Sequence, residues 1–160
     1  MDTNVIEHEV VVDVPVRTAY NQWTQFEEFP RFMEGVERVE QLTDTSLRWV
    51  AEIAGVKREW TAQITRQIPD ELIEWTSTEG AALSGLVRFQ PIDGGRTKVS
   101  LRMEYRPDSV TTKVASAAGI VEARVRGDLE RFKGFIEERG VETGGWRGEV
   151  APPGETRELM

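Results

Sequence analysis

The stretch SLRWVAEIAGVKREWTAQITRQIPDELIEWTST, residues 46–78, alternates apolar and polar residues in three runs. The runs are residues 46–53, 56–68 and 71–78. Such a period of two is typical of strands that bury one face. Ala54-Gly55 and Pro69-Asp70 separate the runs with turn signals that are too short for a helical crossover. The stretch therefore predicts three antiparallel strands with one face on a core.

Further strands flank this stretch on both sides. Runs of the same kind are residues 5–14, 36–43, 85–92 and 97–105. The hairpin turn Asp93-Gly94-Gly95 joins the last two. After the first strand, Pro15 favours the start of one short helix, and a second short helix is expected around Phe29–Met33, ending at Gly35. The prediction is a sheet of about seven strands, with two short helices after the first strand.

A long helix is predicted near the C-terminal end, from Asp108 or Ser109 to about Gly140. Pro107 ends the preceding strand. Apolar residues then recur every three or four positions and form one stripe: Val110, Val114, Ala117, Val121, Val125, Leu129, Phe132 and Ile136. This stripe must be buried against the apolar face of the sheet. The fold class is therefore α+β, with a curved antiparallel sheet wrapped around a long C-terminal helix.

The chain has 160 residues, of which 39% are hydrophobic, and this is enough for one domain with a substantial core. We expect that domain to span residues 1–143. Residues 144–160 contain adjacent glycines and adjacent prolines, so we expect a flexible C-terminal tail there.

Composition narrows the classes of partner. The net charge of −8 disfavours nucleic acid and anionic membrane surfaces. The N-terminal residues lack a basic region followed by an apolar stretch, and no run reaches the roughly 18 apolar residues of a membrane span. We therefore expect a cytoplasmic protein without stable membrane insertion. With no cysteine and one histidine, neither a metal site of the common kinds nor a cofactor is expected, and nothing in the pattern indicates an oligomeric state.

Three segments resemble the START-like, or Bet v 1-like (SRPBCC), superfamily and, more narrowly, its polyketide cyclase/dehydrase-like branch. They are DVPVRTAYNQWTQFEEFPRFMEGVERVE (13–40), REWTAQITRQIPDELIEWTS (58–77) and GDLERFKGFIEERG (127–140). The resemblance extends over about residues 3–143. It implies a helix-grip fold, in which the curved sheet grips the last helix and encloses a cavity. Members of the superfamily include lipid carriers, plant hormone receptors, aromatase/cyclases and ubiquinone-binding proteins.

The resemblance implies that the cavity binds a hydrophobic small molecule, which could be lipid-, isoprenoid- or polyketide-like. Two alternatives remain open: a polyketide cyclase or dehydratase, and a ubiquinone-binding helper protein. The inward register of the strands carries few ionisable groups, and this favours binding without catalysis. A cyclase would need acid/base groups, for which His8 and Tyr105 are the weak candidates.

The candidate ligand-binding residues lie on the inward register of the strands and on the first part of the long helix. They are Trp49, Trp60, Trp75, Ser77, Val87, Phe89, Leu101, Met103, Tyr105, Val114, Ala117 and Val121. Core packing is the alternative interpretation, because large aromatic side chains also dominate the cores of ordinary sheets. For His8, Ser77 and Tyr105 the choice is between orienting a ligand and acting as hydrogen-bonded core polar groups.

Overall fold

The computed structural model describes residues 4–53, 56–79, 82–106 and 114–150. Within these ranges, the backbone alone is described at residues 4, 53, 56, 79, 82–83, 105–106 and 114–121.

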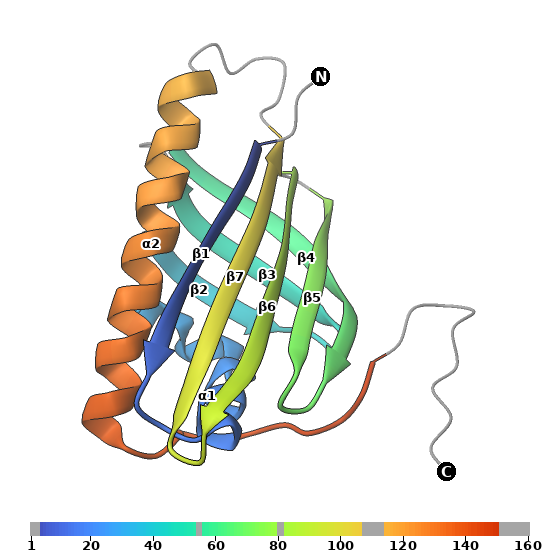
Figure 1. The fold of residues 1–160 in the computed structure, drawn as a ribbon. Coiled ribbons are helices and arrows are strands. Elements are labelled where there is room, and N and C mark those ends of the chain that lie inside the picture. Colours follow the sequence, from blue (N-terminus) through green and yellow to red (C-terminus); the bar gives the residue numbers. More distant parts are fainter. Residues whose placement is uncertain (1–3, 54–55, 80–81, 107–113, 151–160) are drawn as a thin grey trace.

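The described part of the chain contains seven strands and three helical segments (Figure 1). In chain order they are β1 (Asn4–Val12), α1 (Val16–Trp23), the 3-10 helix η1 (Phe26–Arg31), β2 (Val36–Gln41), β3 (Ser46–Ile53), β4 (Val56–Ile68), β5 (Leu72–Glu79), β6 (Ala82–Asp93), β7 (Arg96–Arg106) and α2 (Val114–Arg139).

The strands form one sheet in the order β1-β7-β6-β5-β4-β3-β2, and all neighbouring pairs are antiparallel. Consecutive strands from β2 to β7 are neighbours because short connections join them, and β1 completes the order by pairing with β7. The sheet curls, and α2 lies along its open side next to β1, while α1 closes the lower end (Figure 1). The predicted α+β helix-grip fold is confirmed, including the short helical segments after the first strand.

The second short helix differs in kind and extent from the predicted one. It is a 3-10 helix that contains Pro30 and ends at Arg31, so that Phe32 and Met33 lie beyond its end. Pro30 has no N–H to donate, which disfavours a continuous α-helix here. Gly35 then takes a φ of +90°, a left-handed conformation that glycine adopts without strain, and the chain turns into β2.

The predicted apolar stripe of the long helix is buried where the structure describes its side chains. Val125, Leu129, Phe132 and Ile136 are all buried. The predicted capping residues before Val114 lie outside the described residues. None of the helices in the described ranges has the length and hydropathy needed to cross a membrane.

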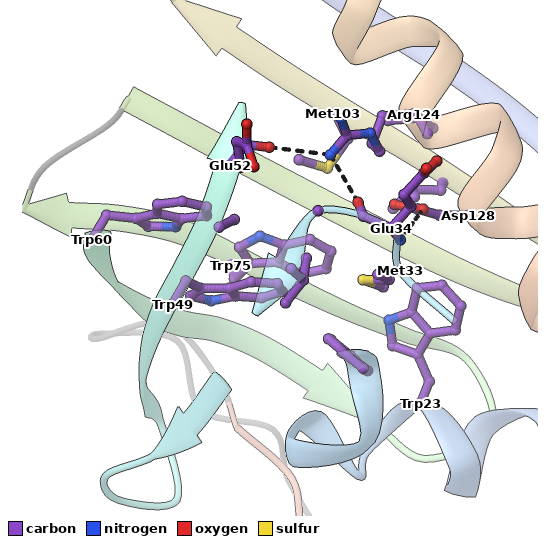
Figure 2. A pocket seen from close by; sticks show the side chains of 16 residues that line it. Trp23, Met33, Glu34, Trp49, Glu52, Trp60, Trp75, Met103, Arg124 and Asp128 are labelled. Carbon is purple, nitrogen blue, oxygen red and sulfur yellow. Dashed lines mark hydrogen bonds between the residues drawn. The ribbon is translucent and has the colours of Figure 1, made fainter. Parts of the chain in front are cut away.

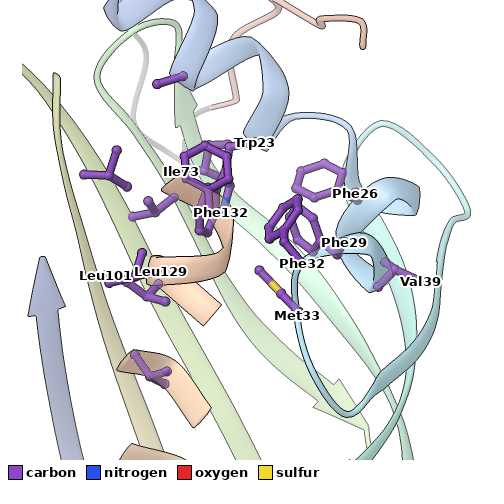
Figure 3. Close-up of a cluster of buried hydrophobic side chains, with 14 of the residues drawn as sticks. Trp23, Phe26, Phe29, Phe32, Met33, Val39, Ile73, Leu101, Leu129 and Phe132 are labelled. Atoms are coloured by element: carbon purple, nitrogen blue, oxygen red, sulfur yellow. The ribbon is translucent and has the colours of Figure 1, made fainter. Parts of the chain in front are cut away.

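An aromatic cluster joins the lower half of α2 to α1 and η1 (Figure 3). The cluster consists of Trp23, Phe26, Phe29, Phe32 and Phe132. The ring centroid of Phe132 lies 4.8 Å from that of Trp23 and 5.2 Å from that of Phe32, with edge-to-face geometry in both pairs. Such pairs add to the free energy that area burial alone provides. The cluster therefore fixes the position of α2 relative to the closed end of the sheet.

Residues 141–150, which include the first part of the expected tail, contact the closed end of the domain. Arg147 donates from Nη1 to Oδ1 of Asn21 at 2.6 Å and from Nη2 to Oδ2 of Asp70 at 2.7 Å. Gln67 and Val150 exchange two backbone hydrogen bonds, of 2.9 and 3.0 Å. This segment is thus attached to α1 and to the end of β4.

Replacing Phe132 with alanine should lower the free energy of unfolding by about 3–5 kcal/mol, because it removes a fully buried ring from the aromatic cluster. Phe135→Ala is the matched control, since Phe135 is only partly buried against the core, and we expect it to cost about half as much or less. Urea unfolding followed by circular dichroism measures both. Equal losses of unfolding free energy in the two variants would contradict the conclusion that Phe132 fixes α2 in the aromatic cluster.

Candidate functional site

A cavity lies between the curled sheet, α2 and the chain that leads from η1 into β2 (Figure 2). About 110 Å³ of it can be reached by the centre of a water molecule. One water needs only about 10–15 Å³ on this measure, so the space is several waters in size. Five aromatic side chains contribute to its wall: Trp23, Phe29, Trp49, Trp60 and Trp75.

Three of these indoles come from neighbouring strands. Trp49 and Trp60 are paired across β3 and β4, and their rings stack with centroids 5.7 Å apart and planes 5° from parallel. Trp75 of β5 is paired with Gly85 of β6, and its indole lies so close to the Gly85 backbone that a Cβ there would overlap the ring. Glycine thus permits the close approach of ring and strand. The result is a broad apolar surface on the inner face of the sheet.

Polar groups stand at the rim, where α2 meets the chain between η1 and β2. Arg124 donates from Nη1 to the carbonyl oxygens of Glu34 at 2.8 Å and Glu52 at 3.1 Å, and Asp128 Oδ1 accepts the Glu34 N–H at 3.0 Å (Figure 2). A Cβ on Gly35 would collide with the Arg124 guanidinium, so this position needs glycine for space as well as for its φ. These hydrogen bonds connect α2 to both sides of the rim.

Asp128 is the most deeply buried acidic group at the rim, with 8% of its surface exposed. Its Oδ1 also accepts a hydrogen bond from Nη2 of Arg131 at 2.5 Å. Burial raises the pKa of Asp128 to about 6, although Arg131 and the Glu34 N–H both favour the charged form. Because this pKa lies above the ordinary value of 3.8, the ionised carboxylate destabilises the fold at neutral pH. The contribution of Asp128 to stability therefore rises as the pH falls through 6.

The structure brings part of the predicted ligand-binding set together. Trp49, Trp60, Trp75, Leu101 and Met103 all line the cavity.

The other predicted residues lie elsewhere or outside the described side chains. Val87 and Phe89 are buried in the core, where Phe89 packs edge-on against Tyr20 with centroids 5.3 Å apart. Ser77 is half-buried on β5, opposite Ala62 of β4. The side chains of Tyr105, Val114, Ala117 and Val121 are outside the described set.

His8 lies on the same face of β1 as the buried Ile6 and Val10 and faces α2. Its Nε2 is 3.6 Å from Oε2 of Glu122, and it is not among the residues that line the cavity. Among the described residues, no group of three histidine, aspartate or glutamate side chains is placed to hold a metal ion.

Sequence reasoning missed the wall contributed by α1 and η1 and the polar rim. Trp23 of α1, Phe29 of η1 and Met33 beyond its end line the cavity, and none of them is among the predicted ligand-binding residues. Arg124 and Asp128 are four residues apart and flank the apolar stripe of α2, which is also the pattern of an ordinary solvated ion pair. The sequence alone does not distinguish a pair at the cavity rim from a solvated ion pair, because the rim forms only where α2 meets the turn before β2, which is distant in the sequence.

Comparison with known proteins agrees with this geometry. Residues 12–133 match the model of a family described as polyketide cyclase/dehydrase and lipid transport. A protein of Streptomyces lincolnensis, described as an uncharacterised 17.2 kDa protein in the melC2-rnhH intergenic region, is 58% identical over 146 residues. That match covers 91% of this chain and 97% of the relative.

Two solved structures share the fold. The Zhui aromatase/cyclase from Streptomyces sp. R1128 is similar with a TM-score of 0.77 and 21% identity, over 91% of this chain and 100% of that one. A START superfamily protein from Mycobacterium smegmatis is similar with a TM-score of 0.68 and 14% identity, over 84% of this chain and 95% of that one. At these identities the likeness is one of fold.

Gly85→Ala should lower the free energy of unfolding by about 1–3 kcal/mol, because the added Cβ displaces the Trp75 ring from the sheet. Near-UV circular dichroism should change with it, since an indole changes its surroundings. Gly94→Ala serves as the control, because a Cβ there meets nothing within 4 Å, and its effect should stay below about 0.5 kcal/mol. Equal effects of the two substitutions would show that Trp75 does not lie against Gly85.

The Asp128 carboxyl should titrate with a midpoint near pH 6, which carbon-13 NMR of the side chain can follow. On lowering the pH from about 7 to about 5, the stability of the wild type should rise relative to that of Asp128→Asn, which cannot take up this proton. A midpoint at or below about pH 4, the range of exposed aspartate, would contradict the buried site.

Proposed function

The chain belongs to the polyketide cyclase/dehydrase and lipid transport family, and on this basis we propose that it binds a flat, apolar small molecule in the cavity between the sheet and α2 without transforming it. The observation that carries the proposal is the composition of the cavity wall. Five aromatic rings, together with aliphatic and methionine side chains, form its apolar part, and the charged side chains stand at the rim. This division suits a ligand whose body is apolar and whose polar groups are few.

The physical basis of binding would be the removal of apolar surface from water, which contributes about 25 cal/mol per Å². The stacked pair of Trp49 and Trp60 offers rigid, broad surfaces, which lose little side-chain entropy when a ligand binds. The hydrogen bonds of Arg124 and Asp128 hold α2 and the opposite rim in place before the ligand arrives. Such preorganisation reduces the cost of binding.

A ring-closing enzyme is the second candidate, and the family description supports it. The Streptomyces structure with the same fold is itself described as an aromatase/cyclase. Of the ionisable groups considered, His8 is directed at Glu122 instead of the cavity, whereas Asp128 lines the cavity with a pKa near neutrality. An enzyme of this kind would therefore use Asp128 for proton transfer. Liquid chromatography coupled to mass spectrometry of a polyketide incubated with the protein distinguishes the candidates. A ring-closed product separates from the substrate even at equal mass and is lighter by one water after dehydration, whereas a binding protein returns its ligand unchanged.

Ala51→Leu should weaken the binding of the neutral probe N-phenyl-1-naphthylamine about tenfold or more, because Ala51 lines the cavity and the longer side chain occupies its space. The fold should remain, since filling a cavity is usually neutral or stabilising. Fluorescence titration measures the binding.

Ala123→Leu is the matched control, because it makes the same change at an exposed position of α2 that does not line the cavity. Its affinity for the probe should equal that of the wild type. Absence of probe binding by the wild type, or equal binding by Ala51→Leu, would refute the proposed function.

A further inference from the structure

Two buried hydrogen-bond donors of the cavity wall have no acceptor among the described residues. They are the indole N–H groups of Trp23 and Trp49, whose side chains are 1% and 7% exposed. Figure 2 shows the nitrogen of Trp23 on the side of the ring that faces the cavity. A buried donor without a partner costs free energy, so native proteins leave few of them unpaired.

Among the described residues, the ring contacts of Trp23 offer only weak acceptors to this N–H. The rings of Phe29, Phe32, Phe89 and Phe132 lie with centroids 4.8 to 6.3 Å from that of Trp23. The π face of such a ring is a much poorer acceptor than an oxygen atom. An oxygen that pairs with the Trp23 N–H would therefore have to enter through the cavity.

Whereas the wall of the cavity presents unpaired hydrogen-bond donors, the rim carries mainly acidic side chains. Glu34, Glu52 and Asp128 stand around it, and Arg124 is the one cationic residue among those lining the described cavity. Arg131, just outside this lining, pairs with Asp128 and lies 3.6 Å from Oε1 of Glu34, so three carboxylates face two guanidinium groups. The Nη1 group of Arg124 already donates to two carbonyl oxygens. The chain as a whole carries a net charge of −8. An anionic ligand would therefore meet an excess of negative charge at the entrance.

We propose that the ligand is a neutral, flat molecule with a carbonyl-type oxygen that accepts the indole N–H of Trp23 or Trp49, and that the rim excludes carboxylic acids. This inference rests on the proposed function, namely that the cavity binds a ligand at all. It adds the polarity of that ligand: an acceptor on the buried part and no negative charge at the rim.

Three naphthalenes of nearly equal size test the proposal. 2-Acetylnaphthalene carries the acceptor oxygen, 2-isopropylnaphthalene replaces it with a methyl group, and 2-naphthoate replaces the ketone with an anion. Calorimetric titration at about pH 7 should give the ketone an affinity about three- to tenfold above that of the hydrocarbon, which is the range of one neutral hydrogen bond. The carboxylate should bind about tenfold or more weakly than the ketone.

Variants assign these preferences to residues. Trp23→Phe or Trp49→Phe should reduce the preference for the ketone over the hydrocarbon, because phenylalanine keeps an aromatic ring but has no N–H. The double variant Glu34→Gln with Glu52→Gln should reduce the difference in affinity between the ketone and the carboxylate. Glu130→Gln removes one charge from an exposed position of α2 that does not line the cavity, and it should leave this difference in affinity unchanged. If Trp23→Phe does not fold, the indole N–H proton signals of the wild type test both donors, because the N–H that pairs with the ketone should shift when the ketone binds and should not shift in the same way with the hydrocarbon.

The outcomes separate this inference from the proposed function. Equal binding of all three naphthalenes overturns the inference and leaves the binding function intact. So does an unchanged ketone preference in both tryptophan variants, or, where one variant does not fold, indole N–H signals that respond equally to ketone and hydrocarbon. Binding of the carboxylate as tightly as the ketone also overturns it. Failure of all three compounds and of N-phenyl-1-naphthylamine to bind overturns both.

Discussion

The attachment of α2 to the segment that contains α1 and η1 determines whether a cavity exists. In the lower half of the helix, Phe132 packs edge-on against Trp23 and Phe32 and is fully buried. In the next turns, Asp128 and Arg124 bind the backbone of Glu34 instead of an apolar partner. The helix is therefore fixed at both levels, and the sheet cannot close the remaining space by moving toward it.

Two glycines adapt the wall of this space to large side chains. The indole of Trp75 occupies the space that a Cβ on residue 85 would fill, and the guanidinium of Arg124 occupies the space that a Cβ on residue 35 would fill. In each case a bulky group approaches the backbone of another element, the neighbouring strand for Trp75 and the turn before β2 for Arg124, more closely than a residue with a Cβ would allow. The broad surface of the wall and the hydrogen-bonded rim thus both depend on positions that carry no side chain.

Local patterns predicted the sheet and the long helix, because alternation, turns and a helical stripe are properties of neighbouring residues. They also placed Trp49, Trp60 and Trp75 on one face. The same alternation could not separate Leu101, which lines the cavity, from Val87 and Phe89, which lie in the core. That difference depends on where the aromatic cluster ends along α2, and it arises only from the packing of distant segments. The polar rim was missed for the same reason, since Asp128 becomes buried only when α2 meets the turn before β2.

The methionines offer the most direct test that a ligand occupies this cavity. The chain has four, of which Met33 and Met103 line the cavity, while Met1 and Met160 are the terminal residues. With methyl groups labelled by carbon-13, a bound neutral naphthyl ketone should give nuclear Overhauser effects to Met33 and Met103 and shift their signals. Contacts to neither Met33 nor Met103 in a protein that binds the ketone would place the ligand elsewhere and contradict the account.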